Sequence, residues 1–411
     1  MKLNRYFPFA FIYFFFNSVA LPFGLTYTTL LGPFFYIWVL LKRKKEILLP
    51  FTAVLLPFMI MHIFVIGVDL KSYFLSFLNI TLVYFFCQAV YTFLKICPDP
   101  EKIFRKLLII NSILCVAALV FYLTPYHDLF WIQQNLTKGV GNVRRLRLFT
   151  YEPSYYATLF VPVFLFYLLQ YCLRQNKMNN HLLLLMIFLP IVLSFSVGVI
   201  GSLFLSGIIT FFFHFRHLAP KRRVVNSFIF LATLIAVSFV VIFFFFRNNA
   251  FFSRVMNIFS GNDTSGQGRT SDAFILAGKL LKEKSEYWGI GFGQVKIIGL
   301  DLIRSYYLYQ PGTPVAIPNA AAETLATLGW VGLSARILLE SFLFFYNRVW
   351  TNYFRLMLFL FMFIYQFTGS FITNAAEYVI WIMAFTTAFS QFDVKGIKSN
   401  VVTSIPQRTA G

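Results

Sequence analysis

The stretch Ser265-Gly-Gln-Gly-Arg269, followed by Trp288-Gly-Ile-Gly-Phe-Gly293 and Pro318-Asn319, lies in the longest polar part of the chain, at 247–318. Apolar runs flank it on both sides, and runs of about 17–25 such residues cross a bilayer as helices. Of the 411 residues, 12% are charged, against about 25% in ordinary soluble domains. The sequence therefore predicts an all-α integral membrane protein with one polytopic domain, 1–395.

We count about twelve candidate spans, with ten as the lower bound. The seventh and eighth are short enough to be a broken pair around Ser196-Val-Gly198. The spans are predicted at 6–23, 25–41, 47–68, 73–94, 107–125, 153–173, 182–197, 199–213, 225–246, 319–346, 356–373 and 375–391.

The distribution of Lys and Arg predicts the orientation. Most of the 35 basic residues fall in segments that lie on one side of the membrane if the N-terminus is inside. Short basic loops are retained in the cytoplasm, so both termini, including the tail at 396–411, are predicted to be cytoplasmic. The loops at 126–152 and 247–318 are then external (periplasmic), and their positive charge runs against that rule.

Composition and spacing also exclude several classes of function. The net charge of +20 comes mainly from clusters between apolar runs, where Lys and Arg set topology and meet anionic lipid, so nucleic acid is not an expected partner. Neither the four cysteines nor the five histidines have ligand spacing, which predicts no metal and no cofactor. We find no internal repeat, which weakens a transporter built from matching halves.

The first external loop ends in three arginines close together, Arg144, Arg145 and Arg147, followed by Glu152-Pro-Ser154. If this piece is extended, Arg145 and Arg147 project to one side. Pro153 suits the first turn of a helix, with Glu152 at its positive end. Arginine forks bind diphosphate well, and the alternative is a basic cluster that contacts lipid head groups.

The second external loop predicts an amphipathic helix over 272–287, lying on the outer membrane surface. Arg269 precedes this helix, where free backbone N–H groups favour an anion, so it is a candidate diphosphate ligand. The alternative is a helix-end arginine that pairs with Asp272 or Asp263. The glycine pattern at 289–293 has no strand–turn–helix context for a nucleotide and predicts a tight turn.

Carboxylates within the late spans are further candidates, because a charge in a span faces a cavity or a partner. Glu323 lies one turn after Asn319 and is a candidate general base for a sugar hydroxyl, or else a structural residue. We assign Asn319, Glu152 and Glu377 to binding of a sugar acceptor. Arg336 and Glu340, four residues apart, predict a structural ion pair.

Taken together, these pieces resemble the O-antigen polymerase and ligase superfamily, the Wzy-type polysaccharide polymerases. The resemblance covers most of the chain. It rests on the span layout with its large late external loop, and on motifs in a fixed order. These are Glu152-Pro-Ser154, Gly268-Arg269 opening a helix, Trp288-Gly-Ile-Gly-Phe-Gly293, Asn319-Ala-Ala-Ala-Glu323 and Gly329-Trp-Val-Gly332.

The resemblance implies a glycosyltransferase of the bacterial cytoplasmic (inner) membrane. Its donor is an undecaprenyl-diphosphate-linked oligosaccharide, and the product is an O-antigen, capsule or exopolysaccharide. By analogy Arg145, Arg147 and Arg269 bind the diphosphate, Arg269 and Glu323 are catalytic, and neither nucleotide nor metal takes part. Whether a chain-length regulator acts with the enzyme stays open.

Three alternatives remain. Ligases of the superfamily carry a His where this chain has Pro318, which favours a polymerase over a ligase. A lipid-linked oligosaccharide flippase or transporter would keep its unusual charges inside the bundle rather than in loops. A purely structural membrane subunit would tolerate the loss of Arg147, Arg269 and Glu323.

Overall fold

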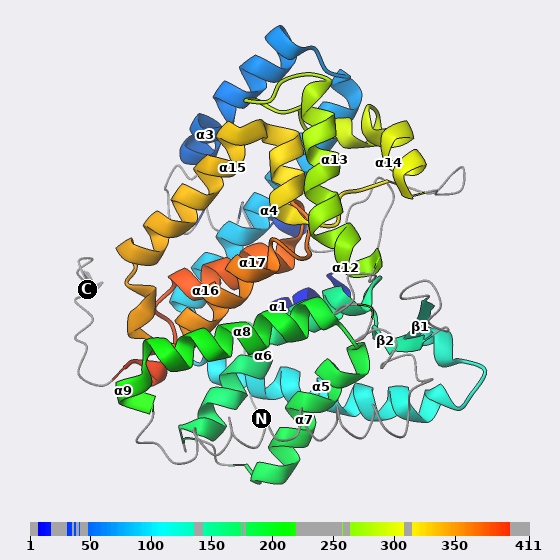
Figure 1. Ribbon diagram of the computed structural model, residues 1–411. Coiled ribbons are helices and arrows are strands. Elements are labelled where there is room, and N and C mark those ends of the chain that lie inside the picture. Colours follow the sequence, from blue (N-terminus) through cyan, green and yellow to red (C-terminus); the bar gives the residue numbers. More distant parts are fainter. Residues whose placement is uncertain are drawn as a thin grey trace.

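The computed structural model describes residues 7–17, 31–34, 37, 41, 48–134, 143–173, 175, 178–218, 257, 264–307 and 315–394 (Figure 1). The predicted span at 225–246 and the tail at 396–411 lie outside these residues, as does most of the span at 25–41. The structure is mainly helical, as predicted. The described α-helices are α1 (Phe7–Phe16), α3 (Leu48–Ile60), α4 (Leu70–Ile96), α5 (Pro100–Tyr122), α6 (Pro153–Cys172), α7 (Asn180–Ser194), α8 (Val197–Phe213), α9 (Phe215–Leu218), α12 (Thr264–Arg269), α13 (Ser271–Lys282), α14 (Gly299–Tyr307), α15 (Ala320–Tyr346), α16 (Tyr353–Tyr365) and α17 (Ala375–Phe385).

Four of these helices, α4, α5, α6 and α15, are long and apolar enough to cross a membrane. Shorter apolar helices are α1, α7, α8, α16, α17 and the segment Phe51–Ile66, which joins α3 to a π-helical turn at Met61–Ile66. These helices suit a bilayer, which supports a helical membrane protein. A count of twelve spans stays a prediction.

One element departs from the all-α prediction. Strands β1 (Trp131–Gln134) and β2 (Val143–Leu146) form an antiparallel hairpin in which Ile132 lies opposite Arg145. The hairpin falls in the first loop, and Arg145 and Leu146, which lie on opposite faces of β2, are both buried.

Polar side chains at the starts of the helices explain why they begin where they do. The Asp69 carboxylate accepts a hydrogen bond from the Ser72 amide at the start of α4. Asparagines do the same for α7, α15, α16 and α17, and Pro100 and Pro153 open α5 and α6. Such caps satisfy amides that have no partner inside the helix.

The predicted break between the seventh and eighth spans is confirmed. α7 ends at Ser194, Phe195 has a left-handed backbone with φ of 48°, and α8 begins at Val197. Both helices pack with α6, which is buried along nearly its whole length and lies at the centre of the main core beside α16 and α17.

α13 corrects the prediction for the large loop. The helix ends at Lys282 rather than Tyr287, and its apolar face is covered by α15 instead of facing lipid. Ala273, Leu276 and Leu280 are fully buried in this contact. In Figure 1, α12 lies between α13 and the β1–β2 hairpin, which brings the two polar loops together.

Candidate active site

The loop at 366–374, between α16 and α17, accepts hydrogen bonds from the first amides of α15. The amide of Ala320 donates to the Gly369 carbonyl at 3.0 Å, and the amide of Ala321 donates to the Gln366 carbonyl at 3.1 Å. The next amide, of Ala322, is capped by Asn319. The first amides of α15 are therefore all used by the protein, so this helix end offers no free donors to an anion.

Asn319 ties this loop to Arg269. The side chain is fully buried. Its amide nitrogen donates to the carbonyls of Arg269 and Phe367, both at 2.7 Å, while its oxygen accepts from Ala322 at 2.8 Å. Asn319 thus fixes the backbone from which the Arg269 side chain projects. Its contact with a sugar acceptor stays a prediction.

The guanidinium of Arg269 pairs with Glu152. Nη2 of Arg269 lies 2.6 Å from Oε1 of Glu152, and the two side chains keep 30% and 17% of their surface exposed. This partner differs from the two aspartates considered from the sequence. Asp272 instead accepts a hydrogen bond from the Tyr306 hydroxyl at 3.1 Å, and Asp263 lies outside the described residues.

The pair is charged at neutral pH. Burial acts to raise the pKa of Glu152, but the Arg269 charge and a hydrogen bond from Ser154 outweigh it, so the pKa lies below its usual value. Burial likewise acts to lower the pKa of Arg269, and the charge of Glu152 outweighs it and raises the pKa. Each partner therefore stabilises the other's charged form.

Arg145 joins this pair from the hairpin. Its side chain is 5% exposed, and Nε donates to the Ser194 carbonyl at the end of α7 at 2.9 Å. Its charge also interacts with Glu152. Arg145 and Glu152, seven residues apart in the first loop, therefore meet Arg269 of the large loop at the start of α6. We call Arg145, Glu152 and Arg269 the arginine cluster.

Arg147 lies apart from the arginine cluster. Its Nη2 donates to the Asp128 carbonyl at 3.0 Å, and its backbone amide donates to Phe130. Its buried Nε makes no hydrogen bond within the described part of the chain. The shared side predicted for Arg145 and Arg147 required extended backbone throughout, but β2 ends at Leu146, and Leu148 has a left-handed φ of 46°.

Glu323 is partly buried, and only one of its two carboxylate oxygens accepts a hydrogen bond from a described residue. Its Oε2 accepts from the Ile372 amide at 2.8 Å. Among the described residues, Oε1 has no hydrogen bond or salt bridge, although Lys296, Arg336 and Glu377 interact with the carboxylate electrostatically. Glu323 therefore has one carboxylate oxygen that can accept a proton, whereas both oxygens of Glu340 and of Glu377 already accept hydrogen bonds.

Glu377 is held differently. It is fully buried, and its two oxygens accept from Arg336 and from the Ser370 hydroxyl. Arg336 also donates to Glu340 at 3.1 Å, which confirms the predicted pair. Gln366 and Thr324 complete this network. The link from Arg336 to Glu377 was missed, although two opposite charges in neighbouring spans are a signal for such a pair.

Tyr365 lies near both groups of charges, with Arg269 and Glu152 on one side and Glu377 on the other. The ring lies against Gly369, where a Cβ would come within 2.7 Å of its Cζ. The sequence analysis missed this residue, because a tyrosine at the end of an apolar helix carries no pattern of its own.

The glycine turn at 289–293 fits into a break in α15. At Gly329 the helix is interrupted, with φ of 68° and ψ of −168°. The amides of Ile290 and Gly291 donate to the carbonyls of Ala326 and Thr327, at 2.9 and 3.0 Å. The amides of Trp330 and Val331 donate to the carbonyls of Glu286 and Tyr287, at 3.0 and 3.1 Å. Two carbonyls and two amides at the break thus gain partners from the large loop.

Two further contacts fasten the same loop to the π-helical turn at Met61–Ile66 and to the start of α4. Nε2 of His62 lies 2.7 Å from the Trp288 carbonyl. The Gln294 side chain bonds both the amide and the carbonyl of Asp69, each at 3.1 Å. The large loop is therefore held by the π-helical turn, the start of α4 and α15, while Arg269 at its upstream end contacts Glu152 at the start of α6.

Comparison with known proteins adds no relative to this picture. No protein-family model matches the chain, and no curated protein matches it. Within the described residues, no group of three His, Cys, Asp or Glu side chains could hold a metal ion. The geometry of the residues therefore carries the functional argument.

Proposed function

We propose that this protein polymerises lipid-linked oligosaccharide repeat units into a cell-surface polysaccharide, with an isoprenoid diphosphate as leaving group. The observation that carries the proposal is the arginine cluster, in which Arg269 is tied to Asn319 at the start of α15. One turn further along α15, Glu323 keeps a carboxylate oxygen without a hydrogen bond from a described residue. This combines cations for a diphosphate with a carboxylate for a hydroxyl group.

In this proposal the acceptor hydroxyl attacks the anomeric carbon of the donor. The bond between that carbon and the diphosphate oxygen breaks, and the carrier leaves with the electron pair. Arg269 and Arg145 stabilise the negative charge that develops on the diphosphate. Oε1 of Glu323 takes the proton of the acceptor hydroxyl. Glu152 holds Arg269 in place until the diphosphate competes for it.

The remaining assignments follow from the same proposal. The chain crosses the bacterial cytoplasmic membrane about twelve times with both termini inside, so that the arginine cluster faces outward, where the lipid-linked units are joined. The donor is an undecaprenyl-diphosphate-linked oligosaccharide, and no metal or nucleotide takes part. Arg147 contributes to the approach of the diphosphate, and Glu377 holds Arg336 rather than the acceptor.

The test is product formation by the purified full chain in liposomes, with repeat units on undecaprenyl diphosphate and no nucleotide or metal. We expect a ladder of lengthened glycans for the wild type and its loss in Arg269→Ala and Glu323→Gln. Lys282→Ala is the matched control, because Lys282 is an exposed cation on the same loop. Transfer of one finished glycan to another lipid would indicate a ligase. Donor crossing the bilayer without lengthening would indicate a transporter, and either result contradicts the proposal.

A further inference from the structure

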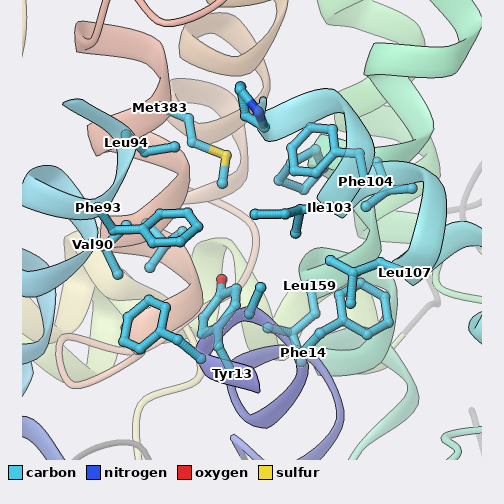
Figure 2. Close-up of a pocket in the computed structure, with 16 residues that line it drawn as sticks. Tyr13, Phe14, Val90, Phe93, Leu94, Ile103, Phe104, Leu107, Leu159 and Met383 are labelled. Carbon is cyan, nitrogen blue, oxygen red and sulfur yellow. The ribbon is translucent and has the colours of Figure 1, made fainter. Parts of the chain in front are cut away.

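The cavity between the membrane helices does not suit a sugar. It lies among α1, α4, α5, α6 and α17, and its lining is almost wholly apolar, with side chains such as Phe14, Ile103 and Met383 (Figure 2). Burying a sugar hydroxyl there without a hydrogen-bond partner would be costly. A glycan held by this protein is therefore expected at the external loops, where an exposed aromatic side chain lies beside the arginine cluster.

That side chain belongs to Tyr151, in the tight turn that leads from the hairpin to α6. The Thr150 amide donates to the Arg147 carbonyl at 3.0 Å. The Thr150 hydroxyl lies within hydrogen-bond distance of the carbonyls of Arg147 and Glu152, at 2.7 and 2.9 Å. Thr150 and Leu148 are both buried. These buried side chains fix the turn and leave Tyr151 at the surface between Thr150 and Glu152.

The ring of Tyr151 is held in place yet accessible. It packs on the ring of Tyr155, with the centroids 5.0 Å apart and the planes at 41°. Tyr151 nevertheless keeps 44% of its surface exposed. Its hydroxyl is close enough to Glu152 and Arg269 to interact electrostatically with both. Tyr151 thus offers an exposed aromatic surface directly beside the cations of the arginine cluster.

The surroundings of Tyr151 differ from those of an aromatic residue that anchors a protein at the membrane interface. Such a residue directs its polar end toward water and head groups. Burial instead raises the pKa of the Tyr151 hydroxyl well above its usual value, and the charge of Glu152 acts in the same direction. The hydroxyl end therefore lies among protein atoms, and the ring runs along the protein surface toward Arg269. Because the side chains of Arg269 and Glu152 also keep 30% and 17% of their surface exposed, one ligand can contact all three.

A glycosyl diphosphate carries the two kinds of group that these side chains bind. Its diphosphate suits the guanidinium groups. A pyranose ring presents C–H groups on one face, and these pack on an aromatic ring through dispersion and weak C–H contacts. The sugar nearest the diphosphate is joined to it through its anomeric carbon. An aromatic ring next to Arg269 therefore lies where this first sugar is expected.

We propose that Tyr151 binds the first sugar of a lipid-linked donor, the one joined to the diphosphate, by packing its exposed ring on the C–H face of that sugar. The identity of the donor rests on the proposed function. In this arrangement Arg269 holds the diphosphate and Tyr151 holds the sugar, so that the anomeric carbon between them has a fixed orientation toward the acceptor.

The experiment measures binding of two radiolabelled probes to the full chain in nanodiscs, undecaprenyl diphosphate and undecaprenyl diphosphate N-acetylglucosamine. Tyr151→Ala should weaken binding of the sugar-bearing probe by about fivefold and binding of the sugarless probe by less than about twofold. Tyr151→Phe and Tyr151→Trp keep an aromatic face and should bind both probes as the wild type does. Tyr126→Ala is the matched control, because Tyr126 is a 67% exposed tyrosine of the same external loop.

Equal weakening of both probes by Tyr151→Ala would overturn the proposal, because the ring would then act on the carrier or on the fold. Unchanged binding of the sugar-bearing probe would overturn it as well. So would an equal loss in Tyr151→Phe, since the hydroxyl rather than the ring would then be the contact. Thermal unfolding identifies a variant that does not fold, and Tyr151→Leu, which keeps an apolar side chain without an aromatic face, provides a second test.

Failure of the proposed function would give a different result. Binding requires no glycan transfer. A wild type that binds the sugar-bearing probe in a manner dependent on the Tyr151 ring, but makes no polymer in liposomes, would overturn the proposed function and leave this inference standing. A wild type that binds neither probe would overturn both.

Discussion

Gly289 and Gly329 are in direct backbone contact, although they belong to the large loop and to α15. A Cβ on Gly329 would lie 2.5 Å from the amide nitrogen of Gly289, and a Cβ on Gly289 would lie 2.6 Å from that of Gly329. Both residues have positive φ, 78° and 68°. This close approach allows the loop to supply the hydrogen bonds that the broken helix lacks.

The first prediction concerns this contact. Gly329→Ala should lower the free energy of unfolding in detergent by about 3 kcal/mol, because it adds both backbone strain and a clash. Amide hydrogen exchange at 285–293 should accelerate as well, since those amides lose their partners on α15. Gly278→Ala in α13 is the control: no atom lies within 4 Å of its added Cβ, and alanine stabilises a helix interior by about 1 kcal/mol. Equal changes in the free energy of unfolding for the two substitutions would show that Gly289 and Gly329 are not in contact.

The sequence revealed the helices more readily than the break in α15. Proline starts and the interruption near Ser196 are local properties, and the structure follows them. Apolar length predicted twelve spans, and among the described residues four helices are long and apolar enough to cross a membrane. The break at Gly329 depends on donors from Ile290 and Gly291, about forty residues earlier in the chain, which no local pattern can reveal. The same limit applies to α13, whose amphipathic pattern does not distinguish a lipid surface from the side of α15.

The candidate site shows the same limit. The residue types were found from the sequence because arginines in external loops and carboxylates in spans are unusual. The pairing of Glu152 with Arg269 could not be found from the sequence, since the two residues are 117 positions apart. Asn319 was chosen as a sugar ligand, yet its polar atoms bind backbone. A helix cap and a ligand contact use the same asparagine chemistry, and only geometry distinguishes them.

The second prediction is a pH dependence that arises from Glu152. Its pKa in the folded protein lies below the ordinary value of 4.5. This depressed pKa contributes stability that is fully present above pH 4.5 and is lost as the pH falls toward the folded value. Thermal unfolding between pH 6 and pH 3 should therefore show a loss in the wild type that is smaller in Glu152→Gln. Identical pH profiles for the two proteins would show that the pair with Arg269 does not form.

The third prediction separates two carboxylates of the late spans. Glu323→Gln keeps an oxygen for the Ile372 amide but cannot take a proton, so polymerisation should slow about 100-fold or more with little change in unfolding. Glu377→Gln leaves Arg336 less well paired in a buried site and should lower the free energy of unfolding by about 2 kcal/mol. The liposome assay and denaturation in detergent measure the two quantities. A rate unchanged by Glu323→Gln would remove that residue from the proposed chemistry.

The fourth prediction uses Asn319 to separate a helix cap from a tether. Asn319→Asp keeps the oxygen that caps Ala322 but loses both donors to the carbonyls of Arg269 and Phe367. Asn319→Ala loses the cap as well, which lowers helix stability by about 1 kcal/mol. If the tether positions Arg269 toward a diphosphate, both variants should raise the KM for the lipid-linked donor at least tenfold, although the aspartate variant also places a buried carboxylate against two carbonyl oxygens and should unfold more readily. A KM that rises only in the alanine variant would mean that Asn319 acts on the helix alone, because the aspartate variant removes the tether without removing the cap.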